Sequence, residues 1–148
     1  MLKFTVDGTP VAWSRTRVAL DHSGGAPRMR FFNTQRMREW KRQLASAAAL
    51  AVRKGKWKKL ESEPVGLIVV VRIPMPVSWS KAKRIQNDAT PCTSKPDCDN
   101  LVKVTDAFSG IVWRDDAQVT TVRVTKRWAK REEAGIDFYI EDLSKETD

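Results

Sequence analysis

The feature that most constrains the fold is the run from Val65 to Ile73, which is almost continuously apolar and rich in β-branched residues. Such a run is typical of a strand at the centre of a sheet, and it predicts a strand covered on both faces. Pro74 and Pro76 follow directly, and proline ends a central strand because it cannot donate a ladder hydrogen bond. The expected core is therefore a sheet built around this strand.

Shorter patterns add the other strands. Apolar and polar residues alternate at about residues 2–7 and 136–140, and a further strand is expected at about 118–128. The predicted fold class is α+β: a small mixed β-sheet packed with one long helix and one or two short ones.

The long helix is expected from Thr34 to Arg53, where apolar residues recur at helical spacing. Asn33 is the expected N-cap, and Phe32 is expected to pack against Met37 as a hydrophobic staple. A short helix or loop is expected around residues 81–84. Gly55 should end the long helix.

A chain of 148 residues is long enough for one hydrophobic core, so we expect a single domain over residues 1–148 with a frayed acidic tail at 141–148. No apolar run approaches the ~20 residues of a membrane span, and the start lacks a secretory signal. We therefore expect a cytoplasmic protein with no membrane partner and no small-molecule cofactor. Two cysteines and one histidine argue against a disulfide framework or structural zinc.

The net charge of +9 is unevenly distributed along the chain. Residues 1–60 hold 14 Lys/Arg against 3 Asp/Glu, a net of +11, whereas residues 61–148 hold 13 against 15, a net of −2. A basic surface of this size predicts salt-dependent attraction to nucleic acid. The alternatives for this basic surface are an ordinary solvated surface and attraction to anionic lipid, and no lipid anchor is evident.

The candidate DNA contacts lie in several basic groups. Two arginine-bearing arms flank a polar tip at residues 21–25, and could form a hairpin that embraces a DNA backbone or a disordered excursion. Other basic residues cluster on the long helix and around residues 81–95, where an ordinary solvated face is the alternative. The candidates are Arg15, Arg17, Arg28, Arg30, Arg38, Lys41, Arg42, Lys81, Lys83, Arg84 and Lys95.

Acidic residues occur in a short segment of this basic chain. The string Lys-Pro-Asp-Cys-Asp-Asn-Leu-Val-Lys spans residues 95–103, and Asp115-Asp116 follows. Asp97 is expected in the loop before a helix at about residues 100–109, with Asp99 in its first turn. The two carboxylates, with a third from the later pair, could converge on one divalent cation, since oxygen ligands suit Mg²⁺. Helix capping and turn formation are the structural alternatives.

A lysine accompanies these acids. Lys103 lies four residues after Asp99, on the same helix face, where an ammonium could hold a phosphate. Asp106 lies roughly 10 Å along the axis from Asp99, too far to share a metal. We therefore expect Asp106 to orient Lys103 through an i, i+3 pair.

The string at 95–103, followed by Asp106-Ala107-Phe108, Gly110, Asp115-Asp116 and Gln118-Val119, resembles the RusA family of Holliday junction resolvases, small bacterial and phage-borne endonucleases. The resemblance is sharp over about residues 95–119 and looser elsewhere. Extra length around 14–30 and 78–94 departs from compact members of the family.

The resemblance implies a homodimer that binds a four-way DNA junction and makes paired symmetric nicks using Mg²⁺, with Mn²⁺ as a substitute. It implies Asp97, Asp99 and Asp116 as catalytic metal ligands and Lys103 as the essential basic group. Asp116 is favoured over Asp115, which stays open as the third ligand.

Two alternatives remain. A restriction-type nuclease would need an acid-x-Lys motif on a following strand, and neither residues 115–118 nor residues 124–126 provide one. A non-catalytic module that binds branched DNA, with its acids as structural caps, would account for the charge pattern without any cleavage.

Overall fold

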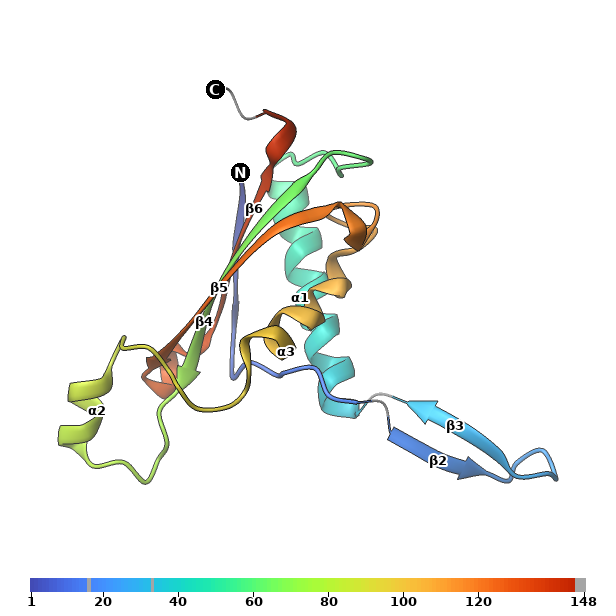
Figure 1. Cartoon of the computed structure of the whole chain (residues 1–148), viewed down its shortest axis with the longest axis horizontal. Coiled ribbons are helices and arrows are strands. Elements are labelled where there is room, and N and C mark those ends of the chain that lie inside the picture. Colours follow the sequence, from blue (N-terminus) through green and yellow to red (C-terminus); the bar gives the residue numbers. More distant parts are fainter. Residues whose placement is uncertain (16, 33, 146–148) are drawn as a thin grey trace.

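The computed structural model describes residues 1–15, 17–32 and 34–145, with the backbone alone for residues 17 and 30–32. A four-stranded sheet has the order β1-β6-β4-β5, and Figure 1 gives the overall arrangement of the chain. β4 and β5 are parallel, while β6 is antiparallel to both β1 and β4. The predicted α+β class with a mixed sheet is therefore confirmed. The strands are β1 (Leu2–Asp7), β4 (Val65–Pro74), β5 (Val119–Ala129) and β6 (Gly135–Asp142).

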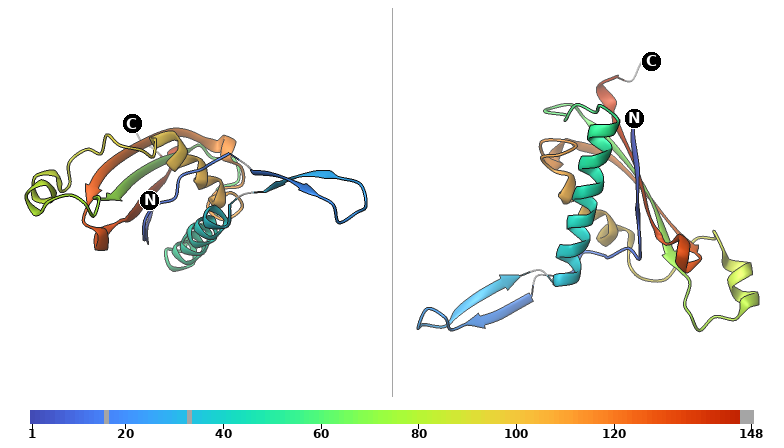
Figure 2. Two further views of the ribbon diagram at one scale, coloured as in Figure 1. Left: turned by 90° about the horizontal axis from the view of Figure 1, so that it is seen from below. Right: turned by 180° about the vertical axis from the view of Figure 1, so that it is seen from behind.

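β4 is a central strand, as its composition predicts, but only one of its faces is fully buried. Val65, Leu67, Val69 and the later odd-numbered residues are buried, whereas the even-numbered residues from 68 onward are partly exposed. The expectation that both faces are covered is thus wrong. The second face is only partly shielded by side chains of neighbouring strands, among them the ion pair of Arg72 with Asp137. Figure 2 shows the long helix (Gln35–Lys54) on one side of the sheet, while the short helix at Lys81–Asn87 lies beyond the end of the sheet.

The long helix α1 spans Gln35–Lys54 and buries the face that was expected to be buried, including Met37, Trp40 and Leu44. Its N-cap is Thr34, whose hydroxyl accepts a hydrogen bond from the Met37 N–H at 3.3 Å. Threonine is a good cap because its oxygen satisfies a free N–H of the first turn. The helix therefore begins one residue later than predicted. The expected cap Asn33 and the side chain of Phe32 lie outside the described residues.

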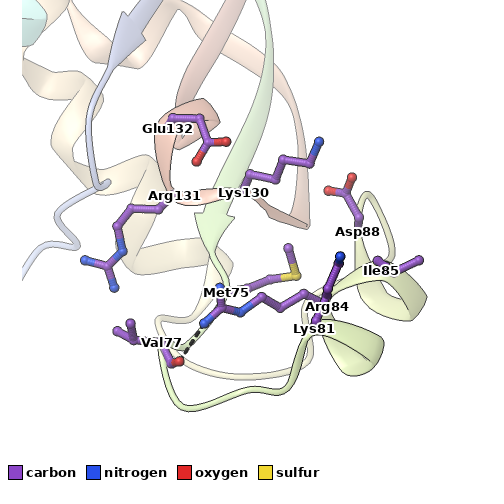
Figure 3. A pocket seen from close by; sticks show the side chains of 9 residues that line it. All are labelled: Met75, Val77, Lys81, Arg84, Ile85, Asp88, Lys130, Arg131 and Glu132. Carbon is purple, nitrogen blue, oxygen red and sulfur yellow. Dashed lines mark hydrogen bonds between the residues drawn. The ribbon is translucent and has the colours of Figure 1, made fainter.

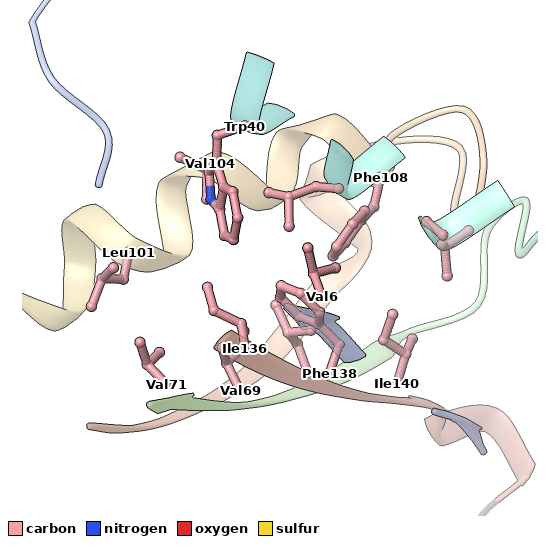
Figure 4. Close-up of a cluster of buried hydrophobic side chains, with 14 of the residues drawn as sticks. Val6, Trp40, Val69, Val71, Leu101, Val104, Phe108, Ile136, Phe138 and Ile140 are labelled. Carbon is pink, nitrogen blue, oxygen red and sulfur yellow. The ribbon is translucent and has the colours of Figure 1, made fainter. Parts of the chain in front are cut away.

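The core lies between the sheet and a helical layer made of α1, α3 (Cys98–Val102) and the 3₁₀ helix η1 (Lys103–Phe108). Figure 4 shows aromatic and branched side chains from both layers meeting there. Phe108 of η1 packs edge-on against Phe138 of β6, with ring centroids 4.9 Å apart, an arrangement that aromatic quadrupoles favour. The segment that carries the acidic motif is therefore fixed directly to the core.

Two elements project from this body. β2 (Arg17–Asp21) and β3 (Arg28–Phe32) pair into a hairpin that extends away from the sheet, as Figure 1 and Figure 2 show. The sequence left a hairpin and a disordered excursion as alternatives for this stretch, and the structure has the hairpin. α2 (Lys81–Asn87), capped by the Ser80 hydroxyl, lies on a separate projection. A short helix or a loop was expected there, and the structure has the helix.

The acidic end of the chain is more ordered than expected. Glu141 and Asp142 belong to β6, and a 3₁₀ turn, η4, follows at Leu143–Lys145. The Leu143 N–H donates to the Pro64 carbonyl at 2.9 Å. The Ser144 hydroxyl donates to Asp142 Oδ1 at 2.6 Å, and this hydrogen bond lowers the pKa of Asp142. The prediction that the tail is frayed is therefore wrong for residues 141–145. Residues 146–148 lie outside the described residues.

None of the helices in the described part of the chain combines the length and apolar character needed to cross a bilayer.

Candidate functional site

Asp97 and Asp99 lie where the motif predicts. Asp97 occupies the N-cap position of α3 and its side chain makes no capping hydrogen bond, while Asp99 lies in the first turn. Both residues are exposed. The helix begins two residues earlier than expected and changes to the 3₁₀ form at Lys103. Two carboxylates thus face solvent at the start of a helix that the core holds in place.

The loop before Asp97 is held by Lys126 of β5. The Lys126 ammonium donates to the Ser94 carbonyl at 2.5 Å and to the Pro96 carbonyl at 2.8 Å. Lys126 is partly buried; its hydrogen bond to Pro96 is partly buried, and its hydrogen bond to Ser94 is exposed. This contact fixes the carboxylate-bearing loop against the C-terminal half of β5.

Lys103 also lies as predicted, on the same helix face as Asp99, with its ammonium 4.0 Å from Asp99 Oδ2. The same ammonium lies over the Trp13 ring, 4.5 Å from its centroid, within the range of a cation–π contact. The Trp13 N–H donates to the Asn100 carbonyl at 2.8 Å. Trp13, which the motif does not include, is therefore part of this site.

The role predicted for Asp106 is wrong. Its carboxylate pairs with the Lys41 ammonium of α1 at 3.0 Å, so it ties η1 to the long helix and does not orient Lys103. The two side chains take different partners: Asp106 pairs with Lys41, whereas the Lys103 ammonium lies near Asp99 and over the Trp13 ring. Lys41, a predicted DNA contact, is engaged in the same ion pair.

Asp115 and Asp116 lie before β5 and differ in their surroundings. Asp115 caps the short 3₁₀ helix η2 (Asp116–Gln118): its Oδ1 accepts from the Ala117 N–H at 2.9 Å, and the Gln118 amide oxygen accepts from the Asp115 N–H at 2.8 Å. Asp116 is exposed, and its Oδ1 accepts a hydrogen bond from the buried Trp113 indole at 2.8 Å. Asp115 thus has a structural task, and Asp116 is the more available carboxylate.

The single chain does not bring the three carboxylates together. Among the described residues, no group of three His, Cys, Asp or Glu side chains is close enough to hold a metal ion. Asp116 precedes the first residue of β5, whereas the loop at Asp97 is fixed to Lys126 seven residues along that strand. Seven strand residues span roughly 23 Å. The expectation that Asp116 returns to the same point within one chain is therefore wrong.

A hollow of about 690 Å³ adjoins Asp97. Arg36 of α1 and Lys95 line it from two sides, together with Asn100 of α3. Ser14 and Thr34, which flank the β2–β3 hairpin at its base, line the same hollow. The exposed carboxylate and basic side chains therefore share one depression at the foot of the hairpin, where a phosphate backbone could lie.

The other predicted DNA contacts are dispersed. Arg15, Arg28, Arg38, Arg42, Lys81, Lys83 and Lys95 are exposed, and Arg84 is partly exposed. The side chains of Arg17 and Arg30 lie outside the described residues. Lys95 lines the hollow beside Asp97, whereas Lys81 and Arg84 line a different one.

Three of these predicted contacts lie on or near a separate hollow. Lys81 and Arg84 line a depression of about 600 Å³ between α2 and the turn at residues 130–132, as Figure 3 shows. In it, the Arg84 guanidinium donates to the Val77 carbonyl at 2.6 Å. Lys83 lies over the Trp79 ring at 4.4 Å. None of the three predicted carboxylate ligands lines this depression.

Sequence reasoning missed four side chains that shape the site: Arg36, Trp13, Lys126 and Trp113. Arg36, Trp13 and Lys126 belong to other segments and approach the acidic motif only in the folded chain, whereas Trp113 lies three residues before Asp116. The available signal was aromatic: a tryptophan beside the basic arm, and another two residues before the acidic pair.

Comparison with known proteins shows the family of the chain. The family model of the RusA endodeoxyribonuclease matches residues 7–140. An uncharacterised protein of Bacillus subtilis (strain 168), YqaN, is 32% identical over 148 residues, with 97% of each chain covered. The chain belongs to the RusA endodeoxyribonuclease family. Membership implies a DNA endonuclease that acts on branched DNA junctions.

Proposed function

We propose that this protein is a Mg²⁺-dependent endonuclease that resolves Holliday junctions by paired, symmetric nicks as a homodimer. The observation that carries the proposal is the exposed pair Asp97 and Asp99, which stands beside Lys103 and a basic hollow in a chain of the RusA family. Carboxylates on a DNA-binding surface repel phosphates unless a cation lies between them.

The residues fit a hard divalent cation in their chemistry. The Asp97 side chain makes no capping hydrogen bond, and the Asp99 carboxylate has the Lys103 ammonium 4.0 Å away. Both side chains can therefore offer carboxylate oxygens to a cation. Asp116 retains a carboxylate oxygen besides the one bonded to Trp113. All-oxygen ligand sets suit Mg²⁺ and Mn²⁺. When bound, the ion would supply Lewis-acid activation of water and charge neutralisation at phosphate.

The protein's own residues then have distinct tasks in phosphodiester hydrolysis. Asp97 and Asp99 would hold the divalent cation, which would supply charge neutralisation at the phosphate. Lys103, positioned by Trp13, donates to a phosphate oxygen as negative charge develops there. The oxygen of water forms a bond to phosphorus, the bond to the 3′ oxygen breaks, and a proton passes from water to solvent while the 3′ oxygen takes one up. The products are a 5′ phosphate and a 3′ hydroxyl.

The homodimer explains how Asp116 can join the site. β5 is one of the two edge strands of the sheet. On the outer edge of β5, backbone groups of Lys126 and Trp128 form hydrogen bonds with residues 89–92. Because backbone groups alternate along a strand, those of Val122 and Val124 also point outward. No backbone partner from the described residues meets these two on that edge. Val122 is 47% exposed. An open edge of this kind is a ready surface for pairing.

Antiparallel pairing of two β5 edges about a two-fold axis near Val122 would give one isologous interface. In that register, residue 116 of one copy lies level with residue 128 of the other. Lys126 of that second copy holds the loop at Pro96, next to Asp97. The proposed metal site is therefore shared: Asp97 and Asp99 from one protomer, and Asp116 from its partner.

The first test is cleavage of a synthetic four-way junction by Asp97→Asn. We expect the variant to bind the junction but to cut it about a hundredfold or more slowly with Mg²⁺, because a cation ligand for the transition state is lost. Asp106→Asn is the matched control: it removes a carboxylate from the same helical segment, but one paired to Lys41, and should cut normally.

Two outcomes would count against the proposal. Unchanged cutting by Asp97→Asn would remove this residue from the site. A wild-type protein that binds junctions but cuts none with Mg²⁺ or Mn²⁺ would favour the non-catalytic DNA-binding module.

A further inference from the structure

The β2–β3 hairpin has two chemically different faces. Leu20 and Met29 are directly opposite in the antiparallel register, so their side chains leave the same face, and Val18 shares it by alternation. Val18, Leu20 and Met29 are 51%, 65% and 64% exposed. Asp21 and Arg28, also opposite each other, belong to the other face. An apolar strip on one side and charged side chains on the other thus project from the body.

An exposed apolar strip on so small an element requires a partner. A two-stranded hairpin is marginally stable on its own in water, and the described residues of the body leave these three side chains uncovered. The hairpin segment between Ser14 and Thr34 carries four arginines against one aspartate. Its charge fits a polyanion. Two such hairpins packed face to face would bring equal positive charges together, which disfavours a second copy as the occupant.

The base of the hairpin lies next to the candidate site. Ser14 and Thr34 at its base line the same hollow as Asp97, Lys95 and Arg36. A DNA strand whose scissile phosphate lies at Asp97 would therefore continue along the hairpin. The apolar strip would then meet nucleotides adjacent to the cut.

We infer that the β2–β3 hairpin is a wedge that opens the branch point of DNA. Leu20 and Met29 insert between bases at the junction centre, while the arginines of the hairpin neutralise the surrounding phosphates. A two-stranded ribbon fits a DNA groove, and apolar wedges of leucine or methionine unstack base steps. Unstacking costs least where stacking is already interrupted, so the wedge selects a branch point over continuous duplex. This inference rests on the proposed nuclease function.

The test uses a four-way junction with 2-aminopurine at the branch point, in buffer without divalent metal, so that cleavage plays no part. Wild-type protein should raise the fluorescence, because the base leaves its stack. The double variant Leu20→Ser with Met29→Ser should lose this increase and bind the junction roughly tenfold more weakly, since stacking contacts are lost. Its affinity for linear duplex should stay near that of the wild type.

Ile85→Ser is the matched control, because Ile85 is 70% exposed but lies on α2; it should keep the fluorescence increase. A double variant that still opens the junction would overturn the inference. So would a double variant whose mass by light scattering falls below that of the wild type, since the hairpin would then be an interface between copies.

The two proposals fail in distinguishable ways. If the wild type opens the junction without metal yet never cuts it with Mg²⁺, the nuclease proposal fails and the wedge stands. If the wild-type protein cuts the junction with Mg²⁺ but produces no fluorescence increase, the wedge proposal fails and the nuclease proposal stands.

Discussion

At the scale of single residues, the ammonium of Lys103 lies between an indole ring and a carboxylate. The Trp13 ring centroid is 4.5 Å away, and Asp99 Oδ2 is 4.0 Å away. The Asp99–Lys103 spacing could be predicted from the sequence because it lies within one helical turn. Trp13 could not, because its approach depends on how the first strand leads into the hairpin.

Replacing Trp13 tests whether the ring positions this ammonium. Trp13→Leu should slow single-turnover junction cleavage roughly two- to fivefold, since an exposed cation–π contact contributes about 0.5–1 kcal/mol. Trp13→Phe keeps an aromatic face and should cleave close to the wild-type rate. Equal rates for Trp13→Leu and the wild type would show that the ring has no positioning role. Both variants retain the backbone hydrogen bond to Asn100.

At the scale of elements, the acidic loop depends on β5 through one side chain. Lys126 donates to two carbonyls of the loop at residues 94–96, and hydrogen bonds that involve a charged group are stronger than neutral ones. The element boundaries could largely be predicted, because alternation and helical periodicity are local. The Lys126 contact could not, since a lysine on a strand is ordinarily solvated.

Removing this contact should loosen the loop and the fold together. We expect Lys126→Met to lower the free energy of unfolding by about 2 kcal/mol and Tm by about 4–8 °C. Amide exchange at residues 94–97 should accelerate. Lys130→Met removes an exposed charge just beyond β5 and is the comparison variant, with Tm expected near that of the wild type. A Lys126→Met protein with unchanged Tm and exchange would contradict the account of the loop.

At the scale of the whole molecule, sequence and structure agree on the fold class and on the exposed pair Asp97 and Asp99, and they diverge at Asp116. The motif suggested three acids around one point because they are close in sequence. In the folded chain, α3 and η1 run along the sheet away from Asp97 and turn back through Trp113 into β5. The length of that excursion separates Asp116 from the pair, and an open β5 edge suggests that a second copy restores it.

The most direct test of the shared site is complementation between two inactive variants. Asp97→Asn and Asp116→Asn are co-expressed with different tags, and the heterodimer that carries both tags is purified and given a four-way junction with Mg²⁺. If each site is shared between protomers, one of the heterodimer's two sites receives the unchanged Asp97 and the unchanged Asp116, and the other receives both substitutions. The heterodimer should then nick one strand, although neither homodimer cuts. A heterodimer as inactive as its parents would contradict the shared site, because sites built within each chain would then both be broken.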